Sequence, residues 1–346
     1  MSISQDSYFI PSSYSRIVAR ELGLAERDLP TLLQGTGLST DILLPGDETR
    51  LSDRQQLRIL DNGGRILNVP EFGLRLGRRL DPSAHGPLGY LVLSSPDLIT
   101  AMESLRDFLP ARLSLVSIEV TLGEEWLRCE LEIKVNANRD QRRVLQECFA
   151  LTIQSLAESM LGRELHDARI ELAHGRPSYQ RIYRDYLHSP VVFDRDANVY
   201  SVPAELARAP NASGDSDSYA MAQALCLKLL EQVPVAALST GIRVRRLLLS
   251  STPGSVTETE VARAMFISKR TLARRLEKEG TSYRVIREKM LSELAARHLG
   301  ESSLTVEAVA ALLGYNDNAA FRKAFHRWYN MSPSAFRAGS VSKGVT

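Results

Sequence analysis

The spacing of apolar residues near the end of the chain predicts the same arrangement twice: a short helix, a tight turn and a basic helix. The first copy covers residues 257–280 and the second covers residues 303–330. In each copy the apolar residues recur at the spacing of one helix face. Those expected to be buried are Val261, Met265, Ile267, Leu272 and Leu276 in the first copy, and Val309, Leu312, Leu313, Phe321, Phe325 and Trp328 in the second. Ser268 is a suitable N-cap for the first basic helix, and Gly280 is a suitable C-terminal stop.

One long helix is predicted between the two copies, within residues 281–299. Its apolar residues have helical spacing and are Val285, Met290, Leu291, Leu294 and Leu299. Two helix-turn-helix motifs that enter successive major grooves on one face of B-DNA lie roughly 34 Å apart, and a rigid helix can hold such a separation. We therefore expect an all-α C-terminal domain with two helix-turn-helix motifs joined by a long linker helix.

The apolar pattern changes to strict alternation in residues 113–135, with a turn at Gly123 to Glu125, which predicts a β-hairpin. A long helix is expected over residues 139–161, and short strands are expected within residues 168–174 and 189–194. Further helices are expected at residues 14–36 (two helices), 52–68, 70–79 and 179–187, and after a cap at Ser95 or Asp97. This mixture predicts an α+β N-terminal domain in which a sheet is backed by helices.

Charge is distributed unevenly along the chain. The formal net charge is +2, but residues 240–346 carry 18 Lys or Arg against 9 Asp or Glu, a net of +9, whereas residues 1–239 carry a net of −7. Cations clustered on two predicted helices indicate nucleic acid as the partner, and a merely solvated basic surface is the weaker alternative. The helix pair predicted in residues 14–36 has mixed charges, which disfavour a third DNA-binding motif because acidic groups repel phosphate.

The outward faces of the two basic helices combine cations with small or amide side chains. These residues are Lys269, Arg270, Ala273, Arg274, Arg275 and Lys278 on the first helix, and Asn318, Ala319, Arg322, Lys323 and Arg327 on the second. Arg can pair bidentately with guanine and Asn with adenine, and Ala can contact the methyl group of thymine. The pattern is therefore chemically suited to contacts with base edges in a major groove.

Residues 257–337 resemble the DNA-binding domain of AraC/XylS-type transcriptional regulators. The matching stretches are VARAMFISKRTLARRLEKEG and LLGYNDNAAFRKAFHRWYNMSPSAFR. The resemblance implies base-edge roles for Arg270, Ala273, Arg274, Asn318, Ala319 and Arg322, and phosphate contacts by Lys269, Arg275, Lys323 and Arg327. Two positions depart from the family. Asn330 stands where glycine is usual, which costs little because Asn tolerates the left-handed conformation, and Phe266 occupies a turn where a small or polar residue is common, so it is expected to be partly exposed or packed on the linker helix.

Most of residues 15–210 resemble the arabinose-binding-type N-terminal sensor domain of a subset of these regulators. The likeness is carried by GLRLGRRLDPSAHGPLGYLVLSSPDLITAMESL and PSYQRIYRDYLHSPVVFDRDANVY. It implies effector sensing and dimerisation, and it does not identify the effector.

Three parts of the chain are expected from these patterns. Residues 1–210 form an effector-sensing domain, residues 211–239 a linker with a candidate dimerisation helix, and residues 240–346 the DNA-binding domain. A polar, acidic stretch at residues 208–220 supports a boundary there. The apolar stripe of the following helix fits a second subunit slightly better than ordinary core packing, and its members are Met221, Leu225, Leu229 and Leu230.

The sequence therefore predicts a sequence-specific, DNA-binding transcriptional regulator controlled by a small-molecule effector bound in the N-terminal domain. The expected partners are double-stranded promoter DNA and the effector, with RNA polymerase and a second copy of the chain as further candidates. The alternative is a ligand-independent repressor or a DNA-architectural protein. Activation and repression both fit the residues.

No cofactor, metal site, enzyme active site or membrane span is expected. Cys129, Cys148 and Cys226 lie far apart and have no histidine at metal-ligand spacing, so they are expected to be reduced packing residues. No apolar run approaches the roughly 18 residues of a membrane span, and the N-terminus lacks the pattern of a signal peptide, so a cytoplasmic location is expected. His85 is expected to be structural or solvated. An acid–base site can be assembled on paper from His166, His174, His188, Glu171, Asp185 and Asp194, but no accompanying motif fixes its geometry, and a haem ligand among these histidines is equally disfavoured.

Overall fold

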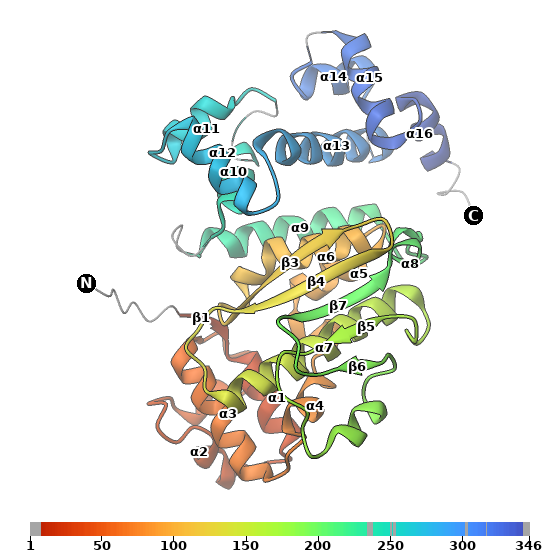
Figure 1. Cartoon of the computed structure of the whole chain (residues 1–346). Helices are drawn as coiled ribbons and strands as arrows, with labels where there is room; N and C mark the ends of the chain where they lie inside the picture. Colours follow the sequence, from red (N-terminus) through yellow and green to blue (C-terminus); the bar gives the residue numbers. More distant parts are fainter. Residues whose placement is uncertain are drawn as a thin grey trace. The chain divides into compact units, whose positions relative to one another are not determined.

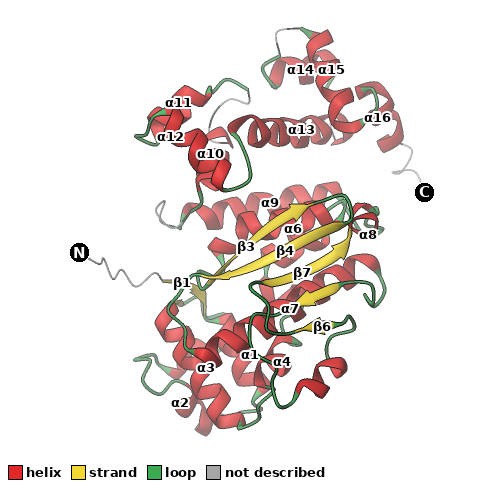
Figure 2. Cartoon of the chain, viewed as in Figure 1, coloured by secondary structure: helices red, strands yellow, loops and turns green. Residues whose placement is uncertain are grey.

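The computed structural model describes residues 8–233, 238–249, 251, 254–301, 304–315 and 317–341. The chain divides into two compact units, residues 1–233 and residues 234–346. Figure 1 labels the elements of both units. The first unit combines helices with strands, and the described part of the second is helical (Figure 2). The expected fold class, an α+β domain followed by an all-α domain, is confirmed.

A five-stranded sheet lies at the centre of the first unit. Its strands in spatial order are β3 (Val116–Leu122), β4 (Trp126–Ile133), β7 (Asn198–Pro203), β5 (Arg169–Glu171) and β6 (Val191–Val192). Neighbouring strands are antiparallel except for β5 and β6, which are parallel. Strands β3 and β4 confirm the predicted hairpin, and β5 and β6 lie inside the two short segments expected to be strands. A separate antiparallel pair is formed by β1 (Tyr8–Pro11) and β2 (Arg50–Ser52).

The hairpin keeps one face for the core and the other for solvent. In β4 the side chains of Leu127, Cys129 and Leu131 are buried, and those between them are exposed. This alternation follows from the two-residue period of a strand, and it made the hairpin recognisable in the sequence. Strand β7 was not predicted. It lies in the middle of the sheet with nearly all of its residues buried, so it shows no alternation of apolar and polar residues.

Helices cover the sheet and fill the rest of the first unit. They are α1 (Ser13–Glu21), α2 (Leu29–Leu32), α3 (Asp53–Leu67), α4 (Phe72–Gly77), α5 (Pro87–Leu93), α6 (Leu98–Phe108), α7 (Arg139–Leu161), α8 (Ala204–Arg208) and α9 (Ser216–Glu231). Helix α7 has the predicted bounds, and Asp97 rather than Ser95 caps α6 through the Thr100 N–H. The helix expected at residues 179–187 is instead a 3₁₀ segment, Gln180–Asp185.

Helix α9 belongs to the first unit, where it packs along α5. Its buried side includes Ala222, Cys226 and Leu230. On its other side Met221 is 64% exposed and Leu225 is 44% exposed. The apolar stripe expected on this helix is thus divided between core packing and the surface.

Seven helices make up the described part of the second unit. They are α10 (Thr240–Leu249), α11 (Glu258–Ala264), α12 (Lys269–Lys278), α13 (Tyr283–Glu301), α14 (Val306–Leu312), α15 (Asn318–Tyr329) and α16 (Pro333–Val341). Helix α13 is the predicted long helix between the two helix-turn-helix motifs. Its 19 residues correspond to a rod of about 28 Å at 1.5 Å per residue.

Most of the apolar residues predicted for the two motifs and the linker helix meet in one core. Its central residues include Leu272, Leu276, Met290, Phe321 and Phe325. The assignment of Leu312 was wrong, because it is exposed, and Val285 on the linker helix is also exposed. Each lies at the edge of a helical stripe, where periodicity alone does not separate a core position from a boundary position.

The three cysteines are buried and unpaired, as expected of packing residues. Burial raises the pKa of the Cys129 and Cys226 thiols to about 12 and raises that of Cys148 further. Within the described ranges, no helix is both long enough and apolar enough to cross a membrane.

Candidate nucleic-acid interface and interior cavity

Helix α12 is held from beneath by Leu272 and Leu276, which are fully buried. At its start the Ser268 hydroxyl accepts a hydrogen bond from the Thr271 N–H at 3.1 Å. After its end Gly280 has a φ of +67°, a conformation that favours glycine. Both predicted ends of the helix are confirmed, so its remaining faces are left for a partner.

Helix α15 is held in the same way. Phe321 and Phe325 are fully buried beneath it, and the Asp317 carboxylate accepts a hydrogen bond from the Ala320 N–H at 2.6 Å. The helix ends at Asn330, whose φ of 53° shows the left-handed conformation expected for an amide residue in place of glycine. The second basic helix is therefore fixed at both ends and along one side.

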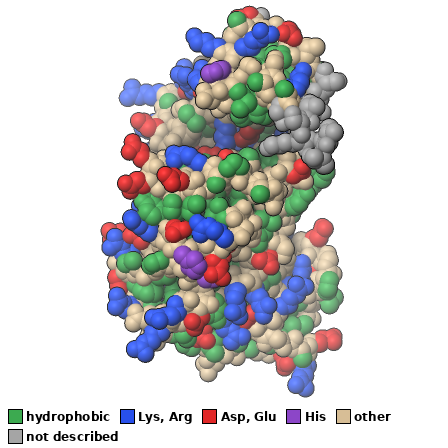
Figure 3. Space-filling view, turned by 90° about the vertical axis from the view of Figure 1, so that its right-hand side faces the viewer, with side chains coloured by type: hydrophobic (Ala, Val, Ile, Leu, Met, Phe, Trp, Pro, Cys, Tyr) green, Lys and Arg blue, Asp and Glu red, His purple; other side chains and the backbone are tan. Residues whose placement is uncertain are grey.

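The residues predicted to contact DNA lie on the surfaces left open by this packing. The exposed ones are Lys269, Arg270, Ala273, Arg274 and Arg275 on α12, and Ala319, Arg322, Lys323 and Arg327 on α15, while Asn318 is half-buried at the start of α15. Lys and Arg side chains are prominent over the C-terminal unit at the top of Figure 3. Each helix thus presents cations beside small or amide groups, as base-edge contacts require.

Three of these cations form ion pairs with carboxylates of neighbouring helices. Lys269 Nζ lies 3.0 Å from Glu258, Arg322 Nη2 lies 3.2 Å from Glu307, and Arg327 Nη2 lies 2.9 Å from Glu288. Within the described residues no ion pair is made by Arg270, Arg274, Arg275 or Lys323. The two groups differ in what DNA must displace. On the predicted contacts, the paired cations would have to exchange a carboxylate for a phosphate or a base, whereas the others would not.

Phe266 is the most unusual residue of the first helix-turn-helix motif. It has a φ of 57° in the turn between α11 and α12, and its side chain is 96% exposed. It was expected to be partly exposed or packed on the linker helix, and the structure places it almost entirely in solvent. A bulky residue in the left-handed region carries a steric cost that glycine avoids.

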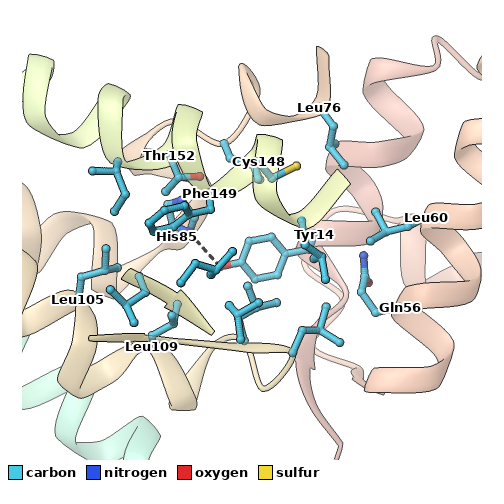
Figure 4. A pocket seen from close by; sticks show the side chains of 18 of the residues that line it. Tyr14, Gln56, Leu60, Leu76, His85, Leu105, Leu109, Cys148, Phe149 and Thr152 are labelled. Carbon is cyan, nitrogen blue, oxygen red and sulfur yellow. Dashed lines mark hydrogen bonds between the residues drawn. The ribbon is translucent and has the colours of Figure 1, made fainter. Parts of the chain in front are cut away.

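The first unit contains an interior cavity of about 90 Å³ between the sheet and the helices. Most of its wall is aliphatic and comes from α3, α6, α7 and the β3–β4 hairpin. Figure 4 shows Tyr14, His85 and Phe149 among the side chains around it. Apolar walls around a few placed polar groups are the lining typical of a small-molecule site, while the volume is below the roughly 300 Å³ at which such sites usually begin.

Tyr14 and His85 form the polar end of the cavity, joined by a hydrogen bond of 3.0 Å between the Tyr14 hydroxyl and His85 Nδ1 (Figure 4). Both side chains are buried. Burial lowers the pKa of His85 to about 4, so its ring is neutral at pH 7. No sequence signal marks this pair, because its members are 71 positions apart and neither lies in a recognisable motif.

A second buried polar cluster lies around Glu147 of α7. Its Oε1 accepts hydrogen bonds from the hydroxyls of Tyr179 at 2.7 Å and Tyr183 at 2.5 Å, and Gly73 of α4 leaves the space that its Oε2 occupies. Burial raises the pKa of the Glu147 carboxyl to about 7, against the opposing effect of the two tyrosines and Arg143. This cluster joins α4, α7 and the 3₁₀ segment, and sequence reasoning did not identify it.

Of the histidines considered for an acid–base site, His166 and His188 lie side by side, with ring centres 5.8 Å apart, and His174 makes other contacts. His188 Nδ1 lies 2.6 Å from Glu158, and His174 Nε2 lies 3.2 Å from the Tyr183 hydroxyl. Glu171 forms an ion pair of 3.0 Å with Arg195. These residues make different local contacts, and the contacts of the described residues do not join all six residues of the hypothesised acid–base site.

Comparison with known proteins supports the separation into a sensor and a DNA-binding region. Residues 27–211 match the family described as the arabinose-binding domain of AraC transcription regulators, N-terminal, and residues 261–339 match a helix-turn-helix domain. The chain is 33% identical to the ornithine utilization regulator of Pseudomonas aeruginosa over 79% of its length and 80% of that protein. It is 26% identical to the HTH-type transcriptional regulator VirS of Mycobacterium tuberculosis over 83% of its length and 84% of that protein.

A crystal structure of the transcriptional regulator CdpR from Pseudomonas aeruginosa is similar at 22% identity, with a TM-score of 0.45, over 98% of this chain and 100% of that one. The family matches and the sequence relatives agree with the exposed basic helices and the separate N-terminal sheet. The chain belongs to the AraC family of DNA-binding transcriptional regulators and carries an N-terminal domain of the arabinose-binding type.

Proposed function

We propose that this regulator contacts base edges through Arg270, Ala273 and Arg274 of α12 and through Asn318, Ala319 and Arg322 of α15. Lys269, Arg275, Lys323 and Arg327 would contact phosphates. The observation that carries the proposal is the exposure of both helix surfaces above fully buried supports, Leu272 and Leu276 in one motif and Phe321 and Phe325 in the other. Buried supports fix the orientation of each helix, so base readout needs little rearrangement.

The separation of the two motifs supports binding to successive major grooves. Helix α13 spans about 28 Å. Adding the distance from its axis to the axes of the two basic helices brings this length close to the roughly 34 Å of one turn of B-DNA. Selection of bound duplexes from a random pool by the full-length protein tests this directly. We expect a site with two conserved blocks about one helical turn apart. Binding without sequence preference at physiological ionic strength would refute base readout and favour a DNA-architectural role.

We further propose that a small effector bound in the N-terminal domain controls this activity, by binding and without a catalytic step. The cavity beside Tyr14 and His85 supports effector binding because it combines an apolar chamber with a buried polar end. A ligand changes DNA binding only if it favours one conformation over another. DNA affinity measured with and without the bound ligand separates this proposal from a ligand-independent repressor.

A homodimer that contacts RNA polymerase completes the proposal. The exposed Met221 and Leu225 lie one turn apart on α9 and offer an apolar contact to a second copy. Two copies would double the number of half-sites bound. Sedimentation of the purified chain across a concentration series tests self-association. A transcription assay with purified RNA polymerase on the selected site then distinguishes activation from repression.

A further inference from the structure

The cavity in the first unit differs from a simple packing defect because a buried polar group inside it lacks a hydrogen bond of normal geometry. This group is His85 Nε2; burial lowers the pKa of the ring, against a hydrogen-bond interaction with the Leu80 backbone. Arg112 acts on Tyr14 through its charge and a hydrogen bond, and a guanidinium can only donate. The Tyr14 hydroxyl proton is then directed to His85 Nδ1, so His85 Nε2 carries the ring's proton.

Arg112 lies next to the Tyr14–His85 end of the cavity, outside the residues that line it, and Arg50 lies within reach of its charge. The Arg112 guanidinium carbon lies 5.7 Å from the centre of the Tyr14 ring, and its Nη2 is 3.4 Å from the position of a Cβ on Gly86, next to His85. Arg112 Nε and Arg50 Nη1 are buried and have no hydrogen-bond partner within the described residues. Neither arginine forms a direct ion pair with a described carboxylate. Burial and the charge of Arg112 lower the pKa of Arg50, against the opposing effect of Glu48.

Two half-buried guanidinium groups that repel each other are unfavourable unless an anion joins them. Charges removed from water are costly when they remain unpaired. Arg50 donates a hydrogen bond of 2.9 Å from its Nη2 to Gln232 Oε1, and the charge of Glu48 offsets its own only in part. A carboxylate placed between Arg112 and the His85 N–H would satisfy both donors with charge-assisted hydrogen bonds.

We propose that the effector of this regulator is a small apolar monocarboxylate, whose hydrocarbon part fills the cavity and whose carboxylate binds Arg112 and His85, with Arg50 adding positive charge. This inference rests on the proposed effector control. A sugar is excluded by the aliphatic wall, which offers its hydroxyls too few partners. A cationic ligand is excluded because its charge would face Arg112 and Arg50.

The volume of the cavity limits the size of the ligand. At about 90 Å³ it is smaller than the roughly 150 Å³ cavity known to admit benzene, so the hydrocarbon part of the ligand has about five carbons at most, as in hexanoate. Each buried methylene raises affinity about three- to fourfold until the cavity is full. Affinity should therefore rise from butyrate to hexanoate and then level off or fall.

The test is calorimetric titration of the full-length protein with butyrate, hexanoate, octanoate, hexanamide and hexylamine. We expect hexanoate to bind once per chain, hexanamide to bind about ten- to a hundredfold more weakly, and hexylamine not to bind. R112Q should weaken the binding of hexanoate by a similar factor. R128Q removes an exposed arginine of β4 and serves as the matched control, with an affinity within about twofold of wild type.

The comparison of hexanoate, hexanamide and hexylamine on the unmodified protein does not depend on the folding of any variant. Equal affinities for the three, or the absence of hexanoate binding, would overturn the proposal. Y14F is a second probe, because it keeps the ring and removes the hydroxyl that orients His85. Y14F should weaken the binding of hexanoate more than the binding of hexanamide. An equal loss of affinity for both would contradict the assigned carboxylate position.

DNA binding provides the separate readout for the proposed function. If hexanoate binds in a way that depends on Arg112 but leaves the affinity for the selected duplex unchanged, the ligand site is supported and effector control is refuted. A change in DNA affinity caused by hexanoate in wild type and lost in R112Q supports both. Sequence-specific DNA binding with no carboxylate binding refutes the ligand class and leaves the DNA-binding proposal standing.

Discussion

Arg322 of α15 lies 3.2 Å from Glu307 of α14, so a residue proposed to contact a base edge is held by a carboxylate when DNA is absent. Both side chains are exposed, and an exposed ion pair contributes little to folding. Its larger effect is on DNA binding. On the proposed contacts, Glu307 would compete with DNA for Arg322 and add a negative charge near the phosphates.

E307Q should therefore strengthen DNA binding. We expect affinity for both specific and random duplexes to rise by a fewfold, because the substitution removes a repulsive charge and frees Arg322. Fluorescence anisotropy across a salt series measures the change. E124Q, at the exposed turn of the β3–β4 hairpin, is the matched control, and a weaker complex with E307Q would argue that Glu307 positions Arg322 for its target.

The proposed division between base and phosphate contacts predicts different specificity profiles. Arg274→Ala and Arg322→Ala should each cost about 1–3 kcal/mol on the specific site and relax the sequence preference. Lys323→Ala should weaken all duplexes more evenly and reduce the salt dependence by about one ion. Competition binding with specific and random duplexes distinguishes these outcomes. Equal losses on both duplexes for the two arginines would show that they contact only the backbone.

Phe266 predicts a stabilising substitution within the DNA-binding unit. Phe266→Gly should raise the free energy of unfolding by about 1 kcal/mol, because glycine adopts a positive φ without the clash of a Cβ, and this outweighs the entropy it adds to the unfolded chain. Phe266→Ala keeps the Cβ and should change stability little. Urea unfolding followed by Trp328 fluorescence in a Trp126→Phe background reports on this unit. Equal stabilities of the glycine and alanine variants would contradict the proposed strain.

The buried Glu147 predicts that the sensor unit loses stability as pH rises. Its carboxyl has a pKa of about 7 in the folded state and an ordinary value near 4.5 when unfolded, so the folded state holds the extra proton between these two pH values. Stability is therefore highest near the lower value and falls by about 3 kcal/mol as pH approaches the upper one. Tyr183, Tyr179 and Arg143 surround this group and oppose the rise in its pKa, and His174 contacts the Tyr183 hydroxyl.

Glu147→Gln tests this assignment because it keeps the shape of the side chain and removes the titrating group. The pH dependence of unfolding between pH 5 and pH 7 should become shallower in the variant. Trp126 fluorescence in a Trp328→Phe background follows the sensor unit. Parallel curves for the variant and its parent would show that another group is responsible.

The exposed stripe on α9 predicts a variant with altered self-association. Leu225→Glu should shift the protein toward monomer, because it places a charge in the proposed apolar contact. Sedimentation velocity measures the result. Leu44→Glu alters another exposed leucine of the same unit and should leave the oligomeric state unchanged. A self-associating Leu225→Glu protein would place the subunit contact elsewhere.

Sequence patterns were most informative where one residue's position is governed by its neighbours along the chain. The ends of α12, the bounds of α7 and the β3–β4 hairpin follow from caps and from apolar periods, which are local properties. The exposure of Arg270 and Arg274 follows in turn from the burial of Leu272 and Leu276 on the same helix. Local rules failed for β7, whose full burial removed the alternation that marks a strand.

The sequence by itself determined the two helix-turn-helix motifs, the cationic residues on their surfaces and the mixed fold of the first unit, because periodicity, capping and charge are written into short stretches of chain. Only the tertiary structure revealed the Tyr14–His85 pair with its neighbouring arginines, the Glu147 cluster and the ion pair between Arg322 and Glu307. Each depends on side chains brought together from separate elements. Their burial and mutual charge, which set their chemistry, exist only once the chain has folded.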